Sequence, residues 1–565
     1  MKFRAFLLAI GALAPAFAWA QGVIPTNNAA IFSAQPVIAQ GATTARSLAS
    51  RAADVMKAAD WGVVCDGSTD NSAAISNMMA NEPATGADII FPPGTCVLGT
   101  GTINIIISGT TIEGASGAET TELARSAASL SSLINLGKNS SGDFPSGIIV
   151  KNLTLTETGS ASSTDYAIYD AGSFNIYSNI KISNFGIGIN SNSVESLIQN
   201  NNIVLTNSIN GAIGIQVNGP GGQNVIYNNT ITGTNSSTET SIGIEVTAGS
   251  ANEFIFNELE ALGTAMNISP PTGGGVYSTI LISNWFDHPE NDGLLLNGTS
   301  APIQRITIDD SWFGSSYTGD GMEVEGTVEG AHISNSEFYL NHGNGIGIDN
   351  SASIQSFILY GSFLGANGLS GISVGNDVSN FSFIGNVMGP TAGLSGNEYP
   401  YFIAGPTNSN FLIEGNNTTG NTNPPFNGST SPTGIIIVGN SDSLGNILNG
   451  PLTANGIAVG VTPSVATLGT NPPVSGTAYQ WAGPGTLQLS CPVTLNPTSS
   501  AAASVSLAIG SSSTLGSTMD AFSLPSGATS LAGMTQTEKA EVPSGWYYSL
   551  TATNATIGTC AAVVH

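Results

Sequence analysis

Two aspartates, Asp292 and Asp320, each stand directly before a glycine at the same point of two consecutive sequence repeats. Glu323 and Glu325 follow Asp320 within five positions. If the repeats stack, the two aspartates lie about 5 Å apart, close enough for one carboxyl group to raise the pKa of the other. Hydrolysis of a glycosidic bond needs two carboxyl groups, one as acid and one as base or nucleophile. The spacing therefore predicts Asp292, Asp320 and Glu323 as candidate catalytic residues.

Aromatic side chains precede both aspartates at nearly the same distance in sequence. Trp285 and Trp312 stand seven and eight positions before them, so stacked repeats would stack the two indoles as well. An amphipathic aromatic pair of this kind is a platform on which a sugar ring can pack. Tyr317 and Glu325 belong to the same two repeats, and we expect these four side chains to contact the substrate.

Each of these features also has a simpler explanation. Asn and Asp before Gly are ordinary corner residues, because both tolerate turns and positive φ, and a Trp at a loop edge often only packs. A column of carboxylates also supplies the oxygen ligands that Ca²⁺ prefers. Because no Cys/His spacing indicates zinc, we expect no metal and no cofactor, with Ca²⁺ as the alternative.

The elements that position these residues follow from a repeated tetrapeptide, glycine followed by an apolar, a variable and an apolar residue. It begins at positions 186, 214, 243, 293, 321, 345 and 371, and at 265 with alanine in the glycine place. Another strand lies between successive copies. Short strands, no helical periodicity and a step of 22–29 residues predict a parallel β-solenoid with turns about 4.8 Å apart. A large β-sandwich is the alternative, but sandwiches do not repeat a tetrapeptide at this period.

The head of the chain carries a resemblance to a known family. Residues 60–75 (DWGVVCDGSTDNSAAI) and 89–95 (IIFPPGT) resemble the entry motif and first-strand signature of the pectate-lyase superfamily. With the repeats, the resemblance covers about residues 54–445. It implies an all-β chain, a right-handed single-stranded parallel β-helix with a short N-terminal capping helix. Thr69 or Asp70 is expected to cap that helix, and Asp66 and Asp70 are expected to be structural.

Four cysteines fall into two local groups, for which three pairings exist. Because the groups sit in different segments, local pairing is favoured, Cys65 with Cys96 and Cys491 with Cys560. The first pair would tie the capping helix to the first turn.

A second, partial resemblance concerns the site. Residues 291–293 (NDG), 319–321 (GDG) and 341–343 (NHG) resemble the pattern of polygalacturonase-type glycosidases. It implies that Asp292 and Asp320 are the base and acid and that His342 is an accessory that orients or polarises. The sequence departs from the pattern at Gly321, where that family has a second Asp, and it has no Lys or Arg in 343–400.

The charge balance limits the partners. The chain of 565 residues has 11 Lys+Arg and 37 Asp+Glu, a net charge of -26, which excludes sequence-independent nucleic-acid binding and an anionic membrane surface. From 182 to 538 the only Lys or Arg is Arg305. β-Elimination on a uronate needs a base and cations on the carboxylate, so this scarcity favours hydrolysis of a neutral or weakly acidic glycan.

The chain divides by composition. Charged residues, an apolar run and Ala18-Trp19-Ala20 indicate a signal peptide and hence a secreted protein, extracellular or periplasmic. The predicted segments are a signal peptide (1–20), a low-complexity segment (21–53), the β-helix (54–450), a linker (451–478) and a small C-terminal β-sandwich (479–565).

The sequence therefore predicts a secreted polysaccharide-processing protein, a glycoside hydrolase that acts through paired carboxylates. The alternatives are a non-catalytic extracellular glycan-binding or adhesion scaffold, a Ca²⁺-dependent polysaccharide lyase, and a tailspike-like depolymerase. The last rests on residues 46–54 (RSLASRAAD), which resemble the segment before the β-helix of some phage tailspikes. We expect a monomer, or a homotrimer if the tailspike alternative holds.

Overall fold

The structure is a computed structural model of the chain. It describes these residues: 36–37, 46–47, 54–126, 132–159, 162–206, 209–390, 395–403, 407–423, 426–427, 435–441, 447–451, 475, 479–480, 487–498, 500–510, 517–524, 526–527, 534–542, 547–557 and 561–564. The predicted signal peptide, most of the predicted linker and Cys560 lie outside them. Within the described part, no helix is both long and apolar enough to cross a membrane.

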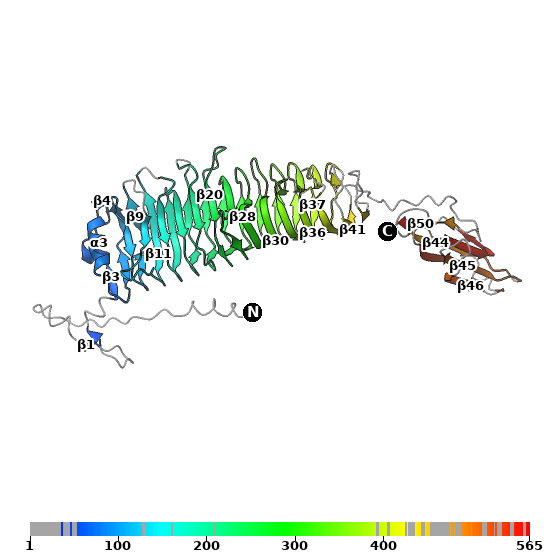
Figure 1. Ribbon diagram of the computed structural model, residues 1–565, viewed down its shortest axis with the longest axis horizontal. Coiled ribbons are helices and arrows are strands. Elements are labelled where there is room, and N and C mark those ends of the chain that lie inside the picture. Colours follow the sequence, from blue (N-terminus) through cyan, green and yellow to red (C-terminus); the bar gives the residue numbers. More distant parts are fainter. Residues whose placement is uncertain are drawn as a thin grey trace, which may run out of the picture. The chain divides into compact units, whose positions relative to one another are not determined.

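Two compact units make up the chain, the first ending at Met56. In the first unit, β1 (Pro36–Val37) and β2 (Arg46–Ser47) pair antiparallel. The second unit contains the predicted solenoid, drawn from blue to yellow in Figure 1, and the C-terminal strands.

The solenoid begins with a capping helix, as predicted. The lead-in consists of β3 (Val55–Lys57), a 3₁₀ turn (Ala58–Trp61), β4 (Asp66–Asp70) and α3 (Ser72–Ala80). Helix α3 buries Ile75, Met78 and Met79, so its apolar face covers the open end of the first turn. The N-cap residue is Asn71, which corrects the expectation of Thr69 or Asp70. Asp70 nevertheless accepts a hydrogen bond from the Ser72 N–H at 2.9 Å, because its side chain reaches back to the first helical turn.

The repeats form stacked parallel strands on three faces, which confirms the predicted β-helix. The first face carries the tetrapeptides. Its strands are β7 (Ile103–Ile105), β10 (Ser132–Leu136), β12 (Tyr166–Asp170), β14 (Ile187–Ser191), β17 (Ile213–Val217), β20 (Ile242–Val246), β24 (Thr264–Ile268), the starts of β28 (Leu294–Asp309) and β30 (Met322–Ser334), β32 (Ile346–Ile348), β35 (Ser370–Val374), β38 (Tyr399–Ile403) and β40 (Phe426–Asn427).

The other two faces consist mainly of shorter strands. The second has β5 (Asp88–Phe91), β8 (Thr111–Gly114), the starts of β11 (Ile149–Glu157) and β13 (Ile176–Ser183), β15 (Leu197–Gln199), β18 (Val225–Tyr227), β22 (Glu253–Ile255), β26 (Ile280–Ile282), the ends of β28 and β30, β33 (Ser353–Tyr360), β36 (Val378–Ile384), β39 (Ser409–Glu414) and β41 (Ile436–Ser441). The third has β6 (Gly94–Leu98), β9 (Thr121–Arg125), the ends of β11 and β13, β16 (Asn202–Val204), β19 (Thr230–Thr232), β23 (Glu258–Glu260), β27 (Trp285–Asp287), β29 (Trp312–Gly314), β31 (Glu337–Tyr339), β34 (Phe363–Gly365) and β37 (Val387–Gly389). Smaller pieces are β21 (Gly249–Ser250), β25 (Val276–Tyr277) and β42 (Ile447–Pro451).

The strand register corrects the first repeat. Ile189 pairs with Ile215, so Gly188, not Gly186, stands in the glycine column of the first face. A side chain on Gly188 would meet the carbonyl oxygen of Gly214, and one on Gly214 would meet that of Gly243. The chain passes too close to the next turn there for a side chain, which explains why glycine recurs at this point.

Apolar and amide side chains stack inside the solenoid. The rings of Phe286, Phe313 and Phe338 stack at 4.5 and 4.7 Å between centroids. Between the second and third faces, buried asparagines of successive turns hydrogen-bond to one another. Asn229 Nδ2, for example, donates to Asn257 Oδ1 at 3.0 Å, and Asn257 Nδ2 donates to Asn284 Oδ1 at 3.0 Å. The stacked asparagine side chains thus supply hydrogen bonds to main-chain and side-chain polar groups that the solenoid buries.

The disulfide prediction is confirmed at the head, where Cys65 bonds to Cys96. The C-terminal strands form two small sheets, as the predicted β-sandwich requires. Their strands are β43 (Tyr479–Gln480), β44 (Leu487–Leu495), β45 (Ala503–Gly510), β46 (Ser517–Leu524), β47 (Met534–Val542), β48 (Tyr547–Thr553), β49 (Ala555–Ile557) and β50 (Ala561–Val564). Cys491 lies in the buried core of these sheets, but its predicted partner Cys560 is outside the described residues.

Candidate functional site

The candidate aspartates stand at the start of two neighbouring strands of the first face. The Gly293 N–H donates to the carbonyl oxygen of Asp320, and the Gly321 N–H donates to that of Asn344. Asp292, Asp320 and Asn344 therefore occupy one column in three consecutive turns, as the repeat spacing predicts.

Side chains in this column hydrogen-bond to the main chain of the next turn. Asp292 Oδ1 accepts from the Asp320 N–H at 2.9 Å. Asp320 Oδ1 accepts from the Asn344 N–H at 2.5 Å, and Asp320 Oδ2 accepts from Asn344 Nδ2 at 3.2 Å. Asn344 Oδ1 accepts from the Ser370 N–H at 3.1 Å. Both aspartates therefore stabilise the solenoid itself, whatever else they do.

Glu323 is brought against Asp320 on the outer surface of the first face. In the strand register, Glu323 pairs with Leu295 on one side and with Gly347 on the other. A side chain on Gly347 would collide with both Asp320 Oδ2 and Glu323 Oε2. The two carboxyl groups thus converge over Gly347, and they fit there because glycine has no side chain.

The electrostatics of this cluster favour a protonated Glu323. Burial, hydrogen bonding to Asp320 and the negative charges of Asp320, Asp292 and Asp349 raise the pKa of Glu323 to about 10. Burial also raises the pKa of Asp292 to about 6; the hydrogen bond from the Asp320 N–H opposes this shift, and the charges of Asp320 and Glu325 add to it. Near neutral pH, Glu323 is an acid with a proton to give.

Glu323 borders a cavity of about 200 Å³ on the outside of the first face. The other lining residues come from the next turns: Asn344, Gly347, Ile348, Asp349, Asn350, Ser373, Val374, Gly375 and Phe402. The cavity therefore combines a protonated acid, an exposed second carboxyl group in Asp349, hydroxyl and amide groups, and one aromatic wall. This is the set of groups that orients and reacts with a polyhydroxylated ligand.

The two tryptophans stack on each other as predicted, but they lie on a different face of the solenoid from the cavity. Trp285 and Trp312 pair in register between β27 and β29 on the third face, with ring centroids 4.7 Å apart. Half of the Trp285 surface is exposed. Tyr317 is also exposed and lies 5.9 Å from the His288 ring. None of these rings is among the residues that line the cavity.

The remaining candidates also lie outside the cavity. His342 is exposed, and its hydrogen bonds among the described residues run from its main-chain N–H to Ser316. Glu325 follows Glu323 by two positions on the same strand and acts on Asp292 through its charge. In the part of the chain that the structure describes, no group of three His, Cys, Asp or Glu side chains is placed to hold a metal ion.

Apart from Glu323, the residues that line the cavity were not among the predicted site residues; the three that contribute most to its chemistry are Asp349, Ser373 and Phe402. Ser373 is the variable residue of its tetrapeptide, and Phe402 stands next to it in the strand register. Aligning the variable residue of every repeat would have found Ser373, because these residues form one outward column; Phe402 follows the last tetrapeptide, and only the strand register places it there.

Comparison with known proteins supports the fold. No family model and no curated protein matches the chain. Tailspike protein 3 of bacteriophage CBA120 is 14% identical, with a TM-score of 0.51, over 73% of this chain and 65% of that protein. The match thus spans somewhat less than two thirds of the tailspike.

Two further solved structures are similar at lower TM-scores. The catalytic unit of a GH87 α-1,3-glucanase from Streptomyces thermodiastaticus is 14% identical over 68% of each chain, with a TM-score of 0.40. The A-module of the mannuronan C-5 epimerase AlgE4 from Azotobacter vinelandii is 12% identical over 68% of this chain and 96% of the module, also at 0.40. At 14% identity, the likeness to the tailspike concerns the fold alone.

Proposed function

We propose that the chain is a polysaccharide-processing β-helix protein that hydrolyses a neutral or weakly acidic glycan, with Glu323 as the general acid. The observation that carries the proposal is the convergence of Glu323 and Asp320 over Gly347 at the wall of a cavity. A carboxyl group that stays protonated near neutral pH is what protonation of a glycosidic oxygen requires.

Asp320 acts on Glu323 rather than on the substrate. The N–H and side-chain amide of Asn344 hold its carboxyl group in place, and its negative charge keeps the proton on Glu323. Glu323 and Asp320 are in direct contact, too close to stand on opposite sides of a scissile bond. We therefore assign Asp320 a positioning role, which departs from the acid and base pairing of Asp292 with Asp320.

Asp349 is the candidate for the base. It stands two residues beyond Gly347, which lies directly over Glu323 in the next turn. One turn across and two residues along a strand separate the Cα atoms of Glu323 and Asp349 by about 8 Å. In inverting hydrolysis the two carboxyl groups stand about 6.5–9.5 Å apart with the attacking water between them, and Glu323 and Asp349 both border the cavity in which that water would lie.

The charge of the cavity supports the choice of substrate. Its ionisable lining residues are Glu323 and Asp349, and the sequence from 343 to 400 has no Lys or Arg. A polyuronate carboxylate would face like charge here, which disfavours it by repulsion. A neutral glycan meets no such repulsion.

The test is Glu323→Gln against Glu414→Gln. Glu414 is an exposed glutamate at the end of β39 on the second face and does not line the cavity. Release of reducing ends is measured over a panel of neutral and acidic glycans, with and without EDTA. We expect Glu323→Gln to lose about 100-fold or more of the turnover and Glu414→Gln to keep it. Equal turnover of the two variants would contradict the assignment, and loss of activity with EDTA would favour a Ca²⁺-dependent lyase.

One observation favours the glycan-binding scaffold as a second candidate. Asp292 and Asp320 are each engaged in main-chain hydrogen bonds between turns, as purely structural corner residues would be. A scaffold of this kind binds glycan in the same cavity but releases no product. Measuring both glycan binding and reducing-end release over the same panel of glycans therefore separates the two functions.

A further inference from the structure

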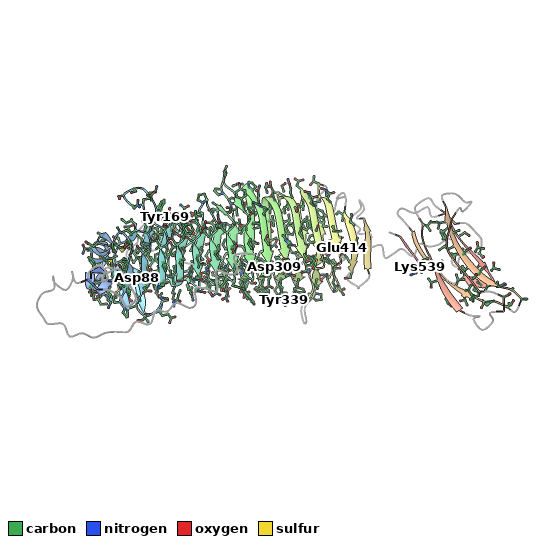
Figure 2. The ribbon with its side chains drawn as sticks, turned by 90° about the horizontal axis from the view of Figure 1, so that it is seen from below. Asp88, Tyr169, Asp309, Tyr339, Glu414 and Lys539 are labelled. Atoms are coloured by element: carbon green, nitrogen blue, oxygen red, sulfur yellow. A yellow bond between two sulfur atoms is a disulfide. The ribbon has the colours of Figure 1, made fainter. Side chains whose placement is uncertain are left out.

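A second hollow lies on the first face, near the N-terminal end of the solenoid. It has a volume of about 360 Å³ and is lined by Thr102, Asn104, Ser132, Asn135, Tyr166 and Tyr169. The rings of Tyr166 and Tyr169 meet edge to face, with centroids 5.6 Å apart. Figure 2 labels Tyr169 on these first turns.

The floor of this hollow is made of amide groups from two successive turns. Asn135 pairs in register with Asn104 on one side and with Tyr169 on the other. Asn135 Nδ2 donates to Asn104 Oδ1 at 2.9 Å, which fixes both amides and leaves the Asn104 Nδ2 and Asn135 Oδ1 atoms for other partners. Tyrosine rings beside oriented amides combine an apolar surface with hydrogen-bonding groups, the chemistry that recognises a sugar ring.

This hollow and the carboxylate cavity lie in one outward column. The register joins Tyr169 to Glu323 through six parallel pairings, by way of Asn190, Gln216, Glu245, Asn267 and Leu295. Six turns correspond to about 29 Å. Of the residues between the two ends, Asn190 is buried, whereas Gln216, Glu245, Asn267 and Leu295 are partly exposed. Apart from Glu245 they are uncharged, and two of the links are side-chain hydrogen bonds, Asn190 to Gln216 and Gln216 to Glu245.

We propose that the Tyr166/Tyr169 hollow is a second glycan-binding site, and that a polysaccharide binds along the column from it to the cavity at Glu323. The inference rests on the proposed function and extends it. One turn of the solenoid is close in length to one hexose unit, so a linear glycan parallel to the axis presents about one sugar to each turn. A chain that reaches from one site to the other must extend over about six turns. The substrate class is therefore a long, neutral, linear glycan.

The experiment measures binding separately from cleavage. The full chain carrying Glu323→Gln is titrated by affinity electrophoresis with neutral linear polysaccharides and with their trimers. Two double variants are compared, in which Tyr169→Ala or Tyr360→Ala is combined with Glu323→Gln. Tyr360 is an exposed tyrosine on β33 of the second face and serves as the matched control.

We expect Tyr169→Ala to weaken polymer binding by about tenfold, Tyr169→Phe to retain most of it, and Tyr360→Ala to leave it unchanged. In the active chain, Tyr169→Ala should raise KM for the polymer without changing turnover of short oligosaccharides, which cannot span both sites. Equal polymer binding by the two alanine variants, or no polymer binding by the unsubstituted chain, would overturn the second site. Failure of the proposed function is a different result: polymer binds through Tyr169, but no glycan is cleaved.

Discussion

Asp320→Asn tests the central electrostatic argument most directly. The substitution keeps the size of the side chain and its ability to accept hydrogen bonds from Asn344, but it removes the negative charge beside Glu323. Two unit charges about 4 Å apart near a protein surface interact by about 4 kcal/mol, and one pKa unit corresponds to about 1.4 kcal/mol. We therefore expect the pKa of Glu323 to fall by up to about 3 units, while burial keeps it above its usual value.

The sign of the effect on activity follows from the role of Glu323. A general acid works while it is protonated, so turnover is present below its pKa and is lost as pH rises through it. The pKa of Glu323 is about 10 in the native chain, which places that loss in the alkaline range. In Asp320→Asn, the alkaline loss of turnover should move to lower pH. The acidic limb reports the base and should move less.

The pH dependence of the free energy of unfolding should also shift in Asp320→Asn. Between the usual pKa of 4.5 and the raised value, the folded chain holds a proton on Glu323 that the unfolded chain releases. The free energy of unfolding therefore falls as pH rises through this window, and removing the charge of Asp320 narrows the window. The assays are the pH profile of turnover and a carboxyl titration by difference infrared spectroscopy, with Glu323→Gln identifying the band. An alkaline limb and a titration that do not move in Asp320→Asn would refute the reasoning.

Two further predictions concern the solenoid and the tryptophan pair. Asn257→Ala removes a buried amide that hydrogen-bonds to Asn229, Asn284 and the Ile226 carbonyl. Because several buried partners are left unpaired, we expect the free energy of unfolding to fall by about 2–4 kcal/mol. Calorimetry should show a lower Tm, and an unchanged Tm would contradict the prediction. Trp285→Ala should leave turnover of short oligosaccharides within about twofold of the native value, because the ring lies on the third face and does not line the cavity. A large loss of turnover would instead place the substrate against the tryptophan pair, the contact that the sequence predicted.

The fold was predictable because its signal is repeated. The glycine tetrapeptide recurs along the chain, and each copy independently indicates a short strand with one outward residue. The head motif and its disulfide added the capped end. Only the first repeat was misaligned, at Gly186 instead of Gly188, because that segment reads Gly-Ile-Gly-Ile and fits the pattern in two registers.

The site was predictable in part, and the limit is physical. Stacking of Asp292 on Asp320 follows from their place before two repeat glycines, so the sequence was sufficient for that column. It could not show that these carboxyl groups are engaged by the main chain of the next turn, nor that the tryptophan pair lies on another face. Loop lengths differ between turns, so a distance in sequence does not determine which face a loop residue joins.

By itself, the sequence determined a parallel β-helix that is poor in positive charge and carries carboxyl groups in neighbouring turns. The tertiary structure decided which of those groups form a site. Glu323 meets Asp320 because Gly347 of the next turn leaves room above both, and Asp349, Ser373 and Phe402 close the cavity from three separate turns. The reason is the hydrogen-bond register between parallel strands, which brings together residues that the chain keeps 24 or more positions apart.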